Sequence, residues 1–231
     1  MKVFAISDLH LSNAVNKPME IFGAKWENYL LKIEKDINLK MSDDDILLLC
    51  GDLSWALKLP DAICDLEYIS KFKGKKVIIK GNHDYWWQSI SKVRGLLPES
   101  VFAIQNDVLK FGNIIICGTR GWTCPENGAL EPEDQKIYLR EGERLKLSLK
   151  NMQKFRQQND RVICMMHFPP FNSKRQPSIF TEILNEYKVN AVVYGHLHGK
   201  DCRKELKLKI NDISYYLTSC DLTDNVLTEI L

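Results

Sequence analysis

Five histidines show the clearest chemical pattern in this sequence. Each follows within about four residues a short apolar run of the kind that forms a buried strand, and they are His10, His83, His167, His196 and His198. Two carboxylates and an amide stand at similar strand ends, namely Asp8, Asp52 and Asn82. Imidazole, carboxylate and amide groups without a thiolate are a ligand set that suits Mn, Fe, Zn or Ni. A metal centre is therefore the first chemistry to consider.

A single histidine at a strand end is more often a hydrogen-bonded structural residue than a ligand. The whole set is different, because loops that leave the carboxyl ends of strands in an open α/β sheet gather in one crevice. Buried carboxylates and imidazoles packed together would repel or lose solvation, and a bound cation removes that cost. About seven candidate ligands exceed what one ion uses, which favours two ions that share an aspartate.

Spacing within two of the motifs agrees with this interpretation. Asp8 and His10 in "DLH", like His196 and His198 in "GHLH", point to the same side of an extended segment, since side chains alternate along it. Two metal ions ~3.5–4 Å apart are the arrangement that assists an in-line displacement at phosphorus.

Short apolar runs and helical periodicity alternate along the chain, which predicts an α/β fold with two series of buried strands in layers, either two-sided or αββα. Strands are predicted at 2–7, 45–50, 76–80, 161–166 and 191–195. Helices are predicted at about 25–38, 59–72, 85–95 and 178–187. A hairpin of short strands is expected around 105–108, a long loop over 119–135 and a basic amphipathic helix after it. The tail, 204–231, alternates like antiparallel strands.

Composition indicates one soluble globular domain over residues 1–231. A net charge of +2 is too small to indicate nucleic-acid or anionic-membrane binding. The basic stretch 136–161 is interrupted by acidic residues, which favours a solvated helix face. Seven cysteines without a C-x-x-C pair, and no apolar run long enough for a signal or membrane span, favour reduced thiols and a cytoplasmic location. Nothing about oligomeric state follows.

Five blocks in order over residues 8–198 carry a resemblance to a known family: "DLH", "GDLS", "GNHD", "MHFPP" and "GHLH". As a set they resemble the calcineurin-like metallophosphoesterase superfamily, in particular its bacterial-type predicted phosphohydrolases. The resemblance implies a layered αββα fold, a two-sheet β-sandwich flanked by helices. It also implies a dinuclear metal-dependent phosphoesterase that cleaves a phosphomonoester or phosphodiester by in-line attack of a metal-bridging hydroxide.

The resemblance also implies a role for each matching residue. Asp8, His10 and His198 would hold the first metal, Asn82, His167 and His196 the second, and Asp52 would bridge them. The metals would be two transition-metal ions, Mn, Fe, Zn or Ni. His83 would contact the substrate phosphate and stabilise or protonate the leaving oxygen, and Asp84 would hydrogen-bond the His83 ring and fix its orientation.

The substrate is less well indicated. Protein phosphatases of the superfamily carry an arginine shortly after the G-D block, whereas this chain continues "GDLSWALK", which disfavours a protein substrate. Arg120, Lys174 and Arg175 are candidate phosphate contacts, with solvated surface cations as the alternative. For the aromatics Tyr85, Trp86 and Trp87, core packing is favoured over substrate stacking.

The expected partner is a small phosphorylated substrate, with a nucleotide as one candidate, and the loop and helix at about 119–160 are a candidate cover for the active site. Two alternatives stay open. One is a nuclease of the same superfamily, and the other is a scaffold that binds metal without catalysis.

Overall fold

The first of two sheets is built from strands that are mostly parallel. The computed structural model describes residues 1–126, 128–199 and 205–231. In this part of the chain the strand order of the first sheet is β11-β1-β2-β3-β4. Its strands are β1 (Val3–Ile6), β2 (Ile46–Leu49), β3 (Lys75–Ile78), β4 (Val101–Ala103) and β11 (Thr228–Glu229). Only β11 runs antiparallel to its neighbour among these described strands.

The second sheet has the order β5-β6-β7-β8-β10-β9. Its strands are β5 (Val108–Phe111), β6 (Ile114–Gly118), β7 (Arg161–Met165), β8 (Ala191–Tyr194), β9 (Lys207–Ile210) and β10 (Ile213–Leu217). The four central strands are parallel, and β5 and β9 are antiparallel edges.

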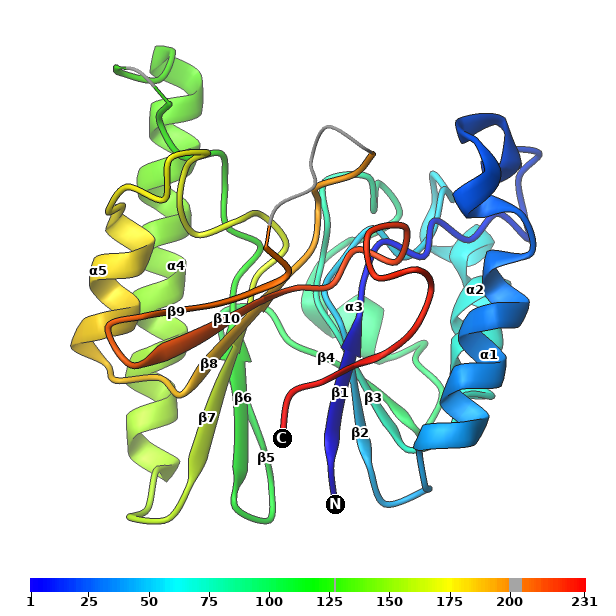
Figure 1. Cartoon of the computed structure of the whole chain (residues 1–231), viewed down its shortest axis with the longest axis horizontal. Helices are drawn as coiled ribbons and strands as arrows, with labels where there is room; N and C mark the ends of the chain where they lie inside the picture. Colours follow the sequence, from blue (N-terminus) through cyan, green and yellow to red (C-terminus); the bar gives the residue numbers. More distant parts are fainter. Residues whose placement is uncertain (127, 200–204) are drawn as a thin grey trace.

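Helices cover the outer faces of both sheets (Figure 1). On the first sheet lie α1 (Tyr29–Lys40) and α2 (Leu59–Ser70), with the short α3 (Ile90–Arg94) beside β4. On the second sheet lie α4 (Pro132–Phe155) and α5 (Ile179–Glu186). Two 3-10 turns, η1 (Met19–Phe22) and η2 (Ala24–Trp26), precede α1.

Alternation along the strands divides the apolar residues between three cores. In β1, Val3 and Ala5 belong to the core between the sheets, whereas Phe4 and Ile6 belong to the core under α1 and α2. Successive side chains of a strand point to opposite faces, so a strand buried on both sides is apolar at every position. The continuous apolar runs thus specify four layers, and the predicted αββα sandwich is confirmed.

Two predicted elements are wrong. The helix expected over 85–95 is restricted to α3, and the residues before it form turns around Asp84. The hairpin expected around 105–108 does not form, because β4 belongs to the first sheet and β5 to the second. The connection between them turns at Asp107, whose Oδ1 accepts the backbone N–H of Gln105 at 2.8 Å. The antiparallel partner of β5 is β6 instead.

The remaining predictions agree with the structure to within a few residues. α4 follows the long loop and buries Leu145, Leu149 and Met152 against the second sheet; whether the segment 119–160 covers the active site stays a prediction. In the tail, β9 and β10 are antiparallel as expected. Two positions from the sequence analysis lie outside the described residues: 204, where the predicted tail begins, and Cys202, one of the seven cysteines. No described helix is both long and apolar enough to cross a membrane.

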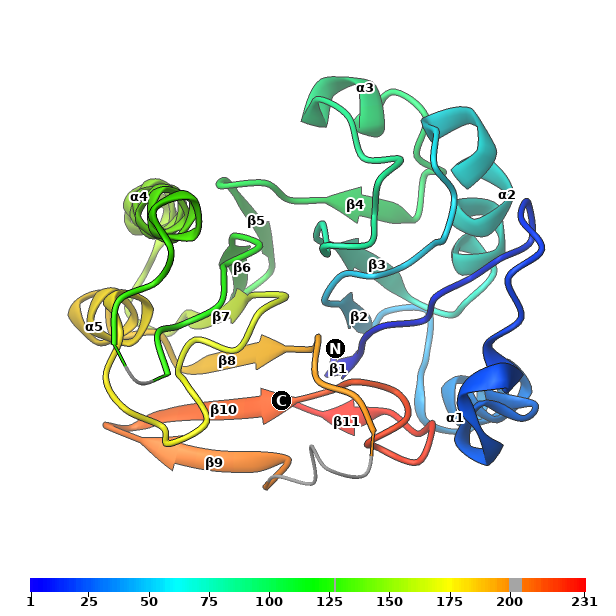
Figure 2. The ribbon, with the colours of Figure 1, turned by 90° about the horizontal axis from the view of Figure 1, so that it is seen from above.

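The parallel strands of both sheets end at the same edge, at the top of Figure 1. The loops that leave them carry Asp8, Asp52, Asn82, His167 and His196. Seen from above, these loops converge where the ends of the two sheets meet (Figure 2). The fold therefore brings the predicted ligands together from strands far apart in the sequence.

Candidate metal centre

Four of the predicted ligand positions have a left-handed backbone. The φ angles are 61° at Asp8, 47° at His10, 50° at Asp52 and 71° at His196. This conformation costs roughly 1–2 kcal/mol for a residue with a Cβ. It is held in place by hydrogen bonds between loops, such as the one from the His10 N–H to the Asp52 carbonyl at 2.9 Å. Strain at such positions is typical of functional sites.

The glycines of the motifs leave room for the carboxylates. A Cβ on Gly81 would lie 2.1 Å from Asp52 Oδ1, and one on Gly195 would lie 2.3 Å from Asp8 Oδ2. Gly51 is equally confined, because its Cβ would lie 2.7 Å from Nδ1 of His167. The glycines directly before Asp52, Asn82 and His196 are thus required by close packing of the loops.

Asp8, His10 and His198 offer ligand atoms that all lie within 4.8 Å of one another. His198 Nε2 lies 3.6 Å from Asp8 Oδ1. Within the described part of the chain, the buried atoms His10 Nδ1 and His198 Nε2 have no hydrogen-bond partner. Buried polar atoms without partners are uncommon and call for an explanation, and a bound ion or water is one. This group fits the first predicted metal site.

A second group is formed by Asp8, Asp52 and His167, again within 4.8 Å. Nδ1 of His167 donates to the Cys50 carbonyl at 2.8 Å, so its Nε2 carries a free lone pair when the ring is neutral. That nitrogen faces Asn82 Oδ1 at 2.7 Å and Asp52 Oδ2 at 3.5 Å. His196 Nδ1 lies 2.9 Å from the same Asn82 oxygen. Lone-pair donors that converge in this way fit a cation.

The electrostatics of the centre favour added positive charge. Burial, together with the charges of Asp8 and Asp84, raises the pKa of Asp52 to about 9. Burial alone would lower the pKa of His198, but the hydrogen bond to Asp221 and the negative charges of Asp8 and Asp221 raise it to about 10. Burial lowers the pKa of His10 to about 3 and that of His196 to about 4. His10 and His196 are therefore neutral imidazoles at pH 7, as metal ligation needs, whereas Asp52 and His198 hold protons that a bound cation would displace.

Asp84 differs from its prediction. It is fully buried, and its carboxylate accepts the backbone N–H groups of Asp52, Leu53, Ser54 and Gly81 at 2.7–3.2 Å and the Trp86 indole N–H at 3.0 Å. Within the described residues, Nδ1 of His83 has no hydrogen-bond partner. The expected bond to the His83 ring is therefore absent there, because backbone donors occupy the carboxylate. Asp84 ties the two ligand loops together instead.

His83 stands beside the centre and is held by its backbone. Its N–H donates to Asp52 Oδ1 at 2.8 Å, and its half-buried ring packs 4.8 Å from the Trp55 ring. Trp55 also stacks on His10 at 4.6 Å. Burial first, and then the charge of Lys17, lower the pKa of His83. The His83 ring thus lies next to the predicted ligands, and within the described residues its Nδ1 makes no hydrogen bond.

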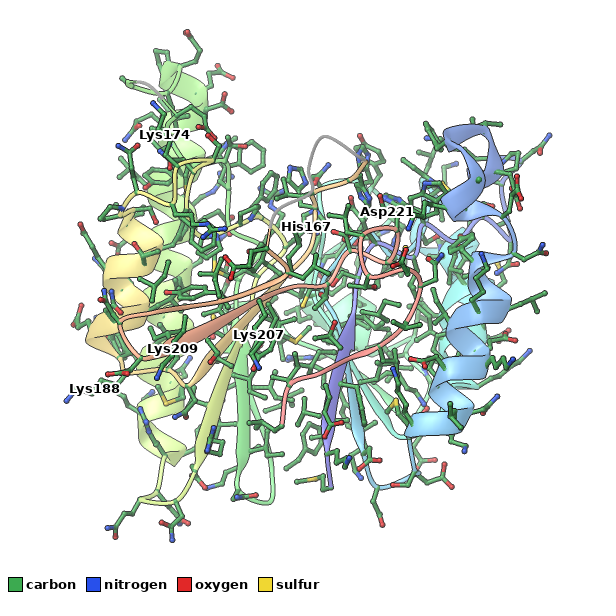
Figure 3. All side chains as sticks on the ribbon, viewed as in Figure 1. His167, Lys174, Lys188, Lys207, Lys209 and Asp221 are labelled. Atoms are coloured by element: carbon green, nitrogen blue, oxygen red, sulfur yellow. The ribbon has the colours of Figure 1, made fainter. Side chains whose placement is uncertain are left out.

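Sequence reasoning missed two residues of this site. Lys17 lies with its Nζ 3.1 Å from the centre of the Trp55 ring and brings a cation near His83. Asp221 accepts Nδ1–H of His198 at 2.8 Å and the N–H of Gly199 at 2.9 Å. It lies close to His167 in the centre of Figure 3. The available signal was its position four residues after the end of β10, at the same sheet edge as the predicted ligands.

The three candidate phosphate contacts are placed differently. Arg120 lies next to the centre, since its carbonyl accepts the N–H groups of His167 and Phe168 at 2.9 and 3.0 Å. Arg175 lines a cavity together with His196 and pairs with Glu205 at 3.2 Å. Lys174 lies far from His167, near the top of α4 (Figure 3), and the structure does not bring it to the site.

The aromatics at 85–87 are mainly structural. Trp86 and Trp87 are buried in the core of the first sheet, as favoured from the sequence, whereas Tyr85 is exposed. Tyr85 makes an edge contact with the His83 ring at 6.1 Å between centroids.

Comparison with known proteins identifies the family. Residues 1–200 match the sequence profile of the family described as calcineurin-like phosphoesterase. This span contains all five motif blocks and all seven predicted ligands. No curated protein matches the sequence.

Solved structures share the fold at low sequence identity. A protein from Thermus thermophilus has a TM-score of 0.62 at 14% identity, with 99% of this chain and 97% of that chain covered. Phosphopantetheinyl hydrolase from Mycobacterium tuberculosis has a TM-score of 0.59 at 14% identity, covering 100% and 95%. A protein of unknown function from Aquifex aeolicus has a TM-score of 0.51 at 12% identity, covering 99% and 95%. At these identities the likeness concerns the fold alone.

Proposed function

The chain belongs to the calcineurin-like phosphoesterase family, and we propose that it hydrolyses a small phosphomonoester or phosphodiester with the help of two metal ions. The observation that carries the proposal is the convergence of buried or half-buried ligand atoms from five separate loops. Among them, His167 Nε2 and Asn82 Oδ1 face each other at 2.7 Å. Such an arrangement is unfavourable without a cation and suited to one.

In this proposal one ion binds to Asp8, His10 and His198, and the other to Asn82, His167 and His196. Asp52 is shared between them, which agrees with its place near both histidine groups: Oδ2 lies 3.9 Å from His10 Nε2 and 3.5 Å from His167 Nε2. When bound, the ions would activate a water molecule and neutralise charge on the phosphate oxygens.

The side chains around the ions then have distinct tasks. His83 faces the substrate phosphate and donates a proton to the leaving oxygen. Lys17 and Arg120 offer cations to the non-bridging oxygens, in place of the arginine that is missing after the G-D block. Asp221 fixes the His198 ring so that Nε2 is directed toward Asp8.

Substrate identity is proposed only as a class. A small phosphate ester suits the family, and nucleotides are one group of candidates. Phosphopantetheinyl compounds belong in the same panel, because one protein with this fold is named a phosphopantetheinyl hydrolase.

The test is hydrolysis of p-nitrophenyl phosphate and bis-p-nitrophenyl phosphate by metal-stripped protein to which Mn is returned. The proposal expects one or both to be cleaved only after Mn is added, and the Asp52→Asn variant to be inactive. A preference between them separates monoesterase from diesterase. If Mn, Fe, Zn and Ni all fail to restore cleavage of either compound, the proposal is wrong and a metal-binding scaffold remains.

A further inference from the structure

A cationic pocket lies beside the metal centre. Its volume is about 220 Å³, and its lining includes Lys80, Arg120, Arg140 and Arg144. The end of β3, the connection from β4 to β5, the end of β6 and the α4 helix contribute to it. Figure 2 shows that connection running from β4 across to β5, on the side of the sandwich where α4 lies.

The lining of the pocket contains more basic side chains than acidic ones. Glu141 is the one carboxylate among its described lining residues. Its Oε1 lies 2.6 Å from Arg144 and 4.0 Å from Arg120, and its Oε2 lies 2.7 Å from the Thr119 hydroxyl. Both carboxylate oxygens of Glu141 therefore already have partners.

Lys80 and Arg140 complete the pocket without an ion pair of their own among residues 1–126, 128–199 and 205–231. Lys80 is half-buried, whereas Arg140 is exposed at the rim. Like charges held together in a cavity repel unless an anion joins them, and arginine forks match the geometry of phosphate oxygens. The pocket is thus suited to an anion, and phosphate is the anion that its residues match best.

The position of the pocket relates it to the proposed reaction. Lys80 precedes Asn82 by two residues, so their Cα atoms are at most about 7 Å apart. Arg120 contacts the other side of the centre through its carbonyl, which accepts the N–H of His167 at 2.9 Å. An anion in the pocket would therefore lie close enough to belong to the same molecule as the scissile phosphate.

We propose that this pocket binds a second phosphate group of the substrate, so that the enzyme prefers an ester with two phosphates over one with a single phosphate. The inference rests on the proposed function and narrows its substrate class. The second phosphate is either linked to the scissile one, as in a diphosphate, or carried elsewhere on the same molecule, as in a bisphosphate. Gln88, Gln105 and Asn106 in the lining offer amides for neighbouring hydroxyl groups.

Binding of inorganic pyrophosphate to the metal-stripped full chain tests the pocket without using catalysis. Isothermal titration calorimetry should show pyrophosphate bound at least tenfold more tightly than phosphate. The double variant Lys80→Gln/Arg140→Gln should lose at least tenfold in pyrophosphate affinity. Lys150→Gln, an exposed cation farther along α4, is the matched control and should bind as the wild type does. Equal affinity for both anions, or an unchanged double variant, overturns the inference.

Kinetics with Mn-loaded protein then distinguish the two sources of the second phosphate. A higher kcat/KM for adenosine 3′,5′-bisphosphate than for adenosine 5′-monophosphate indicates the bisphosphate arrangement, and a higher value for ADP-ribose indicates the linked one. The double variant should reduce either preference at least tenfold. Hydrolysis of p-nitrophenyl phosphate reports on the proposed function separately. An enzyme that cleaves it but binds pyrophosphate no better than phosphate keeps the function and loses this inference.

Discussion

At the scale of single residues, the two side chains that follow Asn82 have separate tasks. Asp84 accepts backbone N–H groups from both the Asp52 and Gly81 loops, so it fixes where the ligands stand. His83 contributes its backbone N–H to Asp52 and leaves its ring beside the centre. A change in the His83 ring should therefore affect the chemistry without disturbing the ligands.

Replacement of His83 by alanine tests this separation. His83→Ala keeps the N–H that binds Asp52, so metal content should equal that of the wild type. Turnover of esters with poor leaving groups should fall by about 10²–10⁴-fold, the usual effect of losing a general acid, and p-nitrophenyl esters should suffer less. Metal analysis and steady-state kinetics on the same preparation give the answer. A variant that loses metal would show His83 to be a ligand or a structural residue.

Asp221 supports a second prediction, because it orients His198 through Nδ1. Asp221→Asn removes the charge that fixes the ring, and metal affinity should fall about 10–100-fold. A chelator competition measures it. Asp212→Asn is the control, since Asp212 is exposed and pairs only with Lys209 among the described residues. Equal affinities in the two variants would contradict the positioning role.

The seven candidate ligands could be predicted as a group, because each stands in a short motif at a strand end. Asp221 lacks a motif, so its role became visible only when β10 was placed beside β8 in space. The bond expected between Asp84 and His83 was wrong for a related reason. The family resemblance implied this pair, whereas in the structure backbone donors from a distant loop take the carboxylate.

At the scale of elements, three of the loops that carry predicted ligands pass unusually close to a neighbouring loop. Gly51, Gly81 and Gly195 allow this approach because they lack a Cβ. The glycines of the motifs therefore act on metal binding through packing, although none of them offers a ligand atom.

Gly81→Ala should weaken the centre without touching a ligand. The new methyl group would lie 2.1 Å from Asp52 Oδ1, so the two loops must separate. We expect a loss of about 1–3 kcal/mol in the free energy of unfolding and at least a tenfold loss in metal affinity. Gly95→Ala is the control, because its nearest contact would be 3.4 Å away. Denaturant unfolding and metal titration of both variants check it, and wild-type behaviour of Gly81→Ala would refute the packing argument.

Elements with a strong hydrophobic pattern could be predicted from the sequence. Elements whose conformation or pairing depends on distant parts of the chain could not. The apolar runs of β1, β2, β7 and β8 identified both sheets, because strands buried on both faces leave a continuous signal. The run of aromatics at 85–87 resembled a helix, yet Trp86 is held by Asp84 and packs as part of a turn. The pairing of β5 with β6 rather than β4 depended on which sheet each strand joins.

At the scale of the whole molecule, the centre joins the two sheets. Asp8, Asp52 and Asn82 come from the first sheet and His167 and His196 from the second. Bound ions would therefore link the two halves across the edge of the sandwich and offset both the buried charges and the strained backbone.

Metal binding should accordingly stabilise the fold. Mn at 100 times its Kd should add about 2.7 kcal/mol to the free energy of unfolding for each site. For a chain of this size that corresponds to a rise in Tm of roughly 5–10 °C for one site. Thermal denaturation of stripped and Mn-loaded protein measures the rise, with Asp52→Asn as the comparison. An equal rise in that variant would place the stabilising ions elsewhere.

The central claim, a two-metal phosphoesterase centre bridged by Asp52, is tested most directly by counting bound Mn. Calorimetric titration of stripped protein, with electron paramagnetic resonance to detect coupling between ions, gives both number and proximity. The account predicts two coupled Mn ions per wild-type chain and loss of the coupled pair in Asp52→Asn. A single ion, no ion, or a coupled pair that survives Asp52→Asn would contradict it.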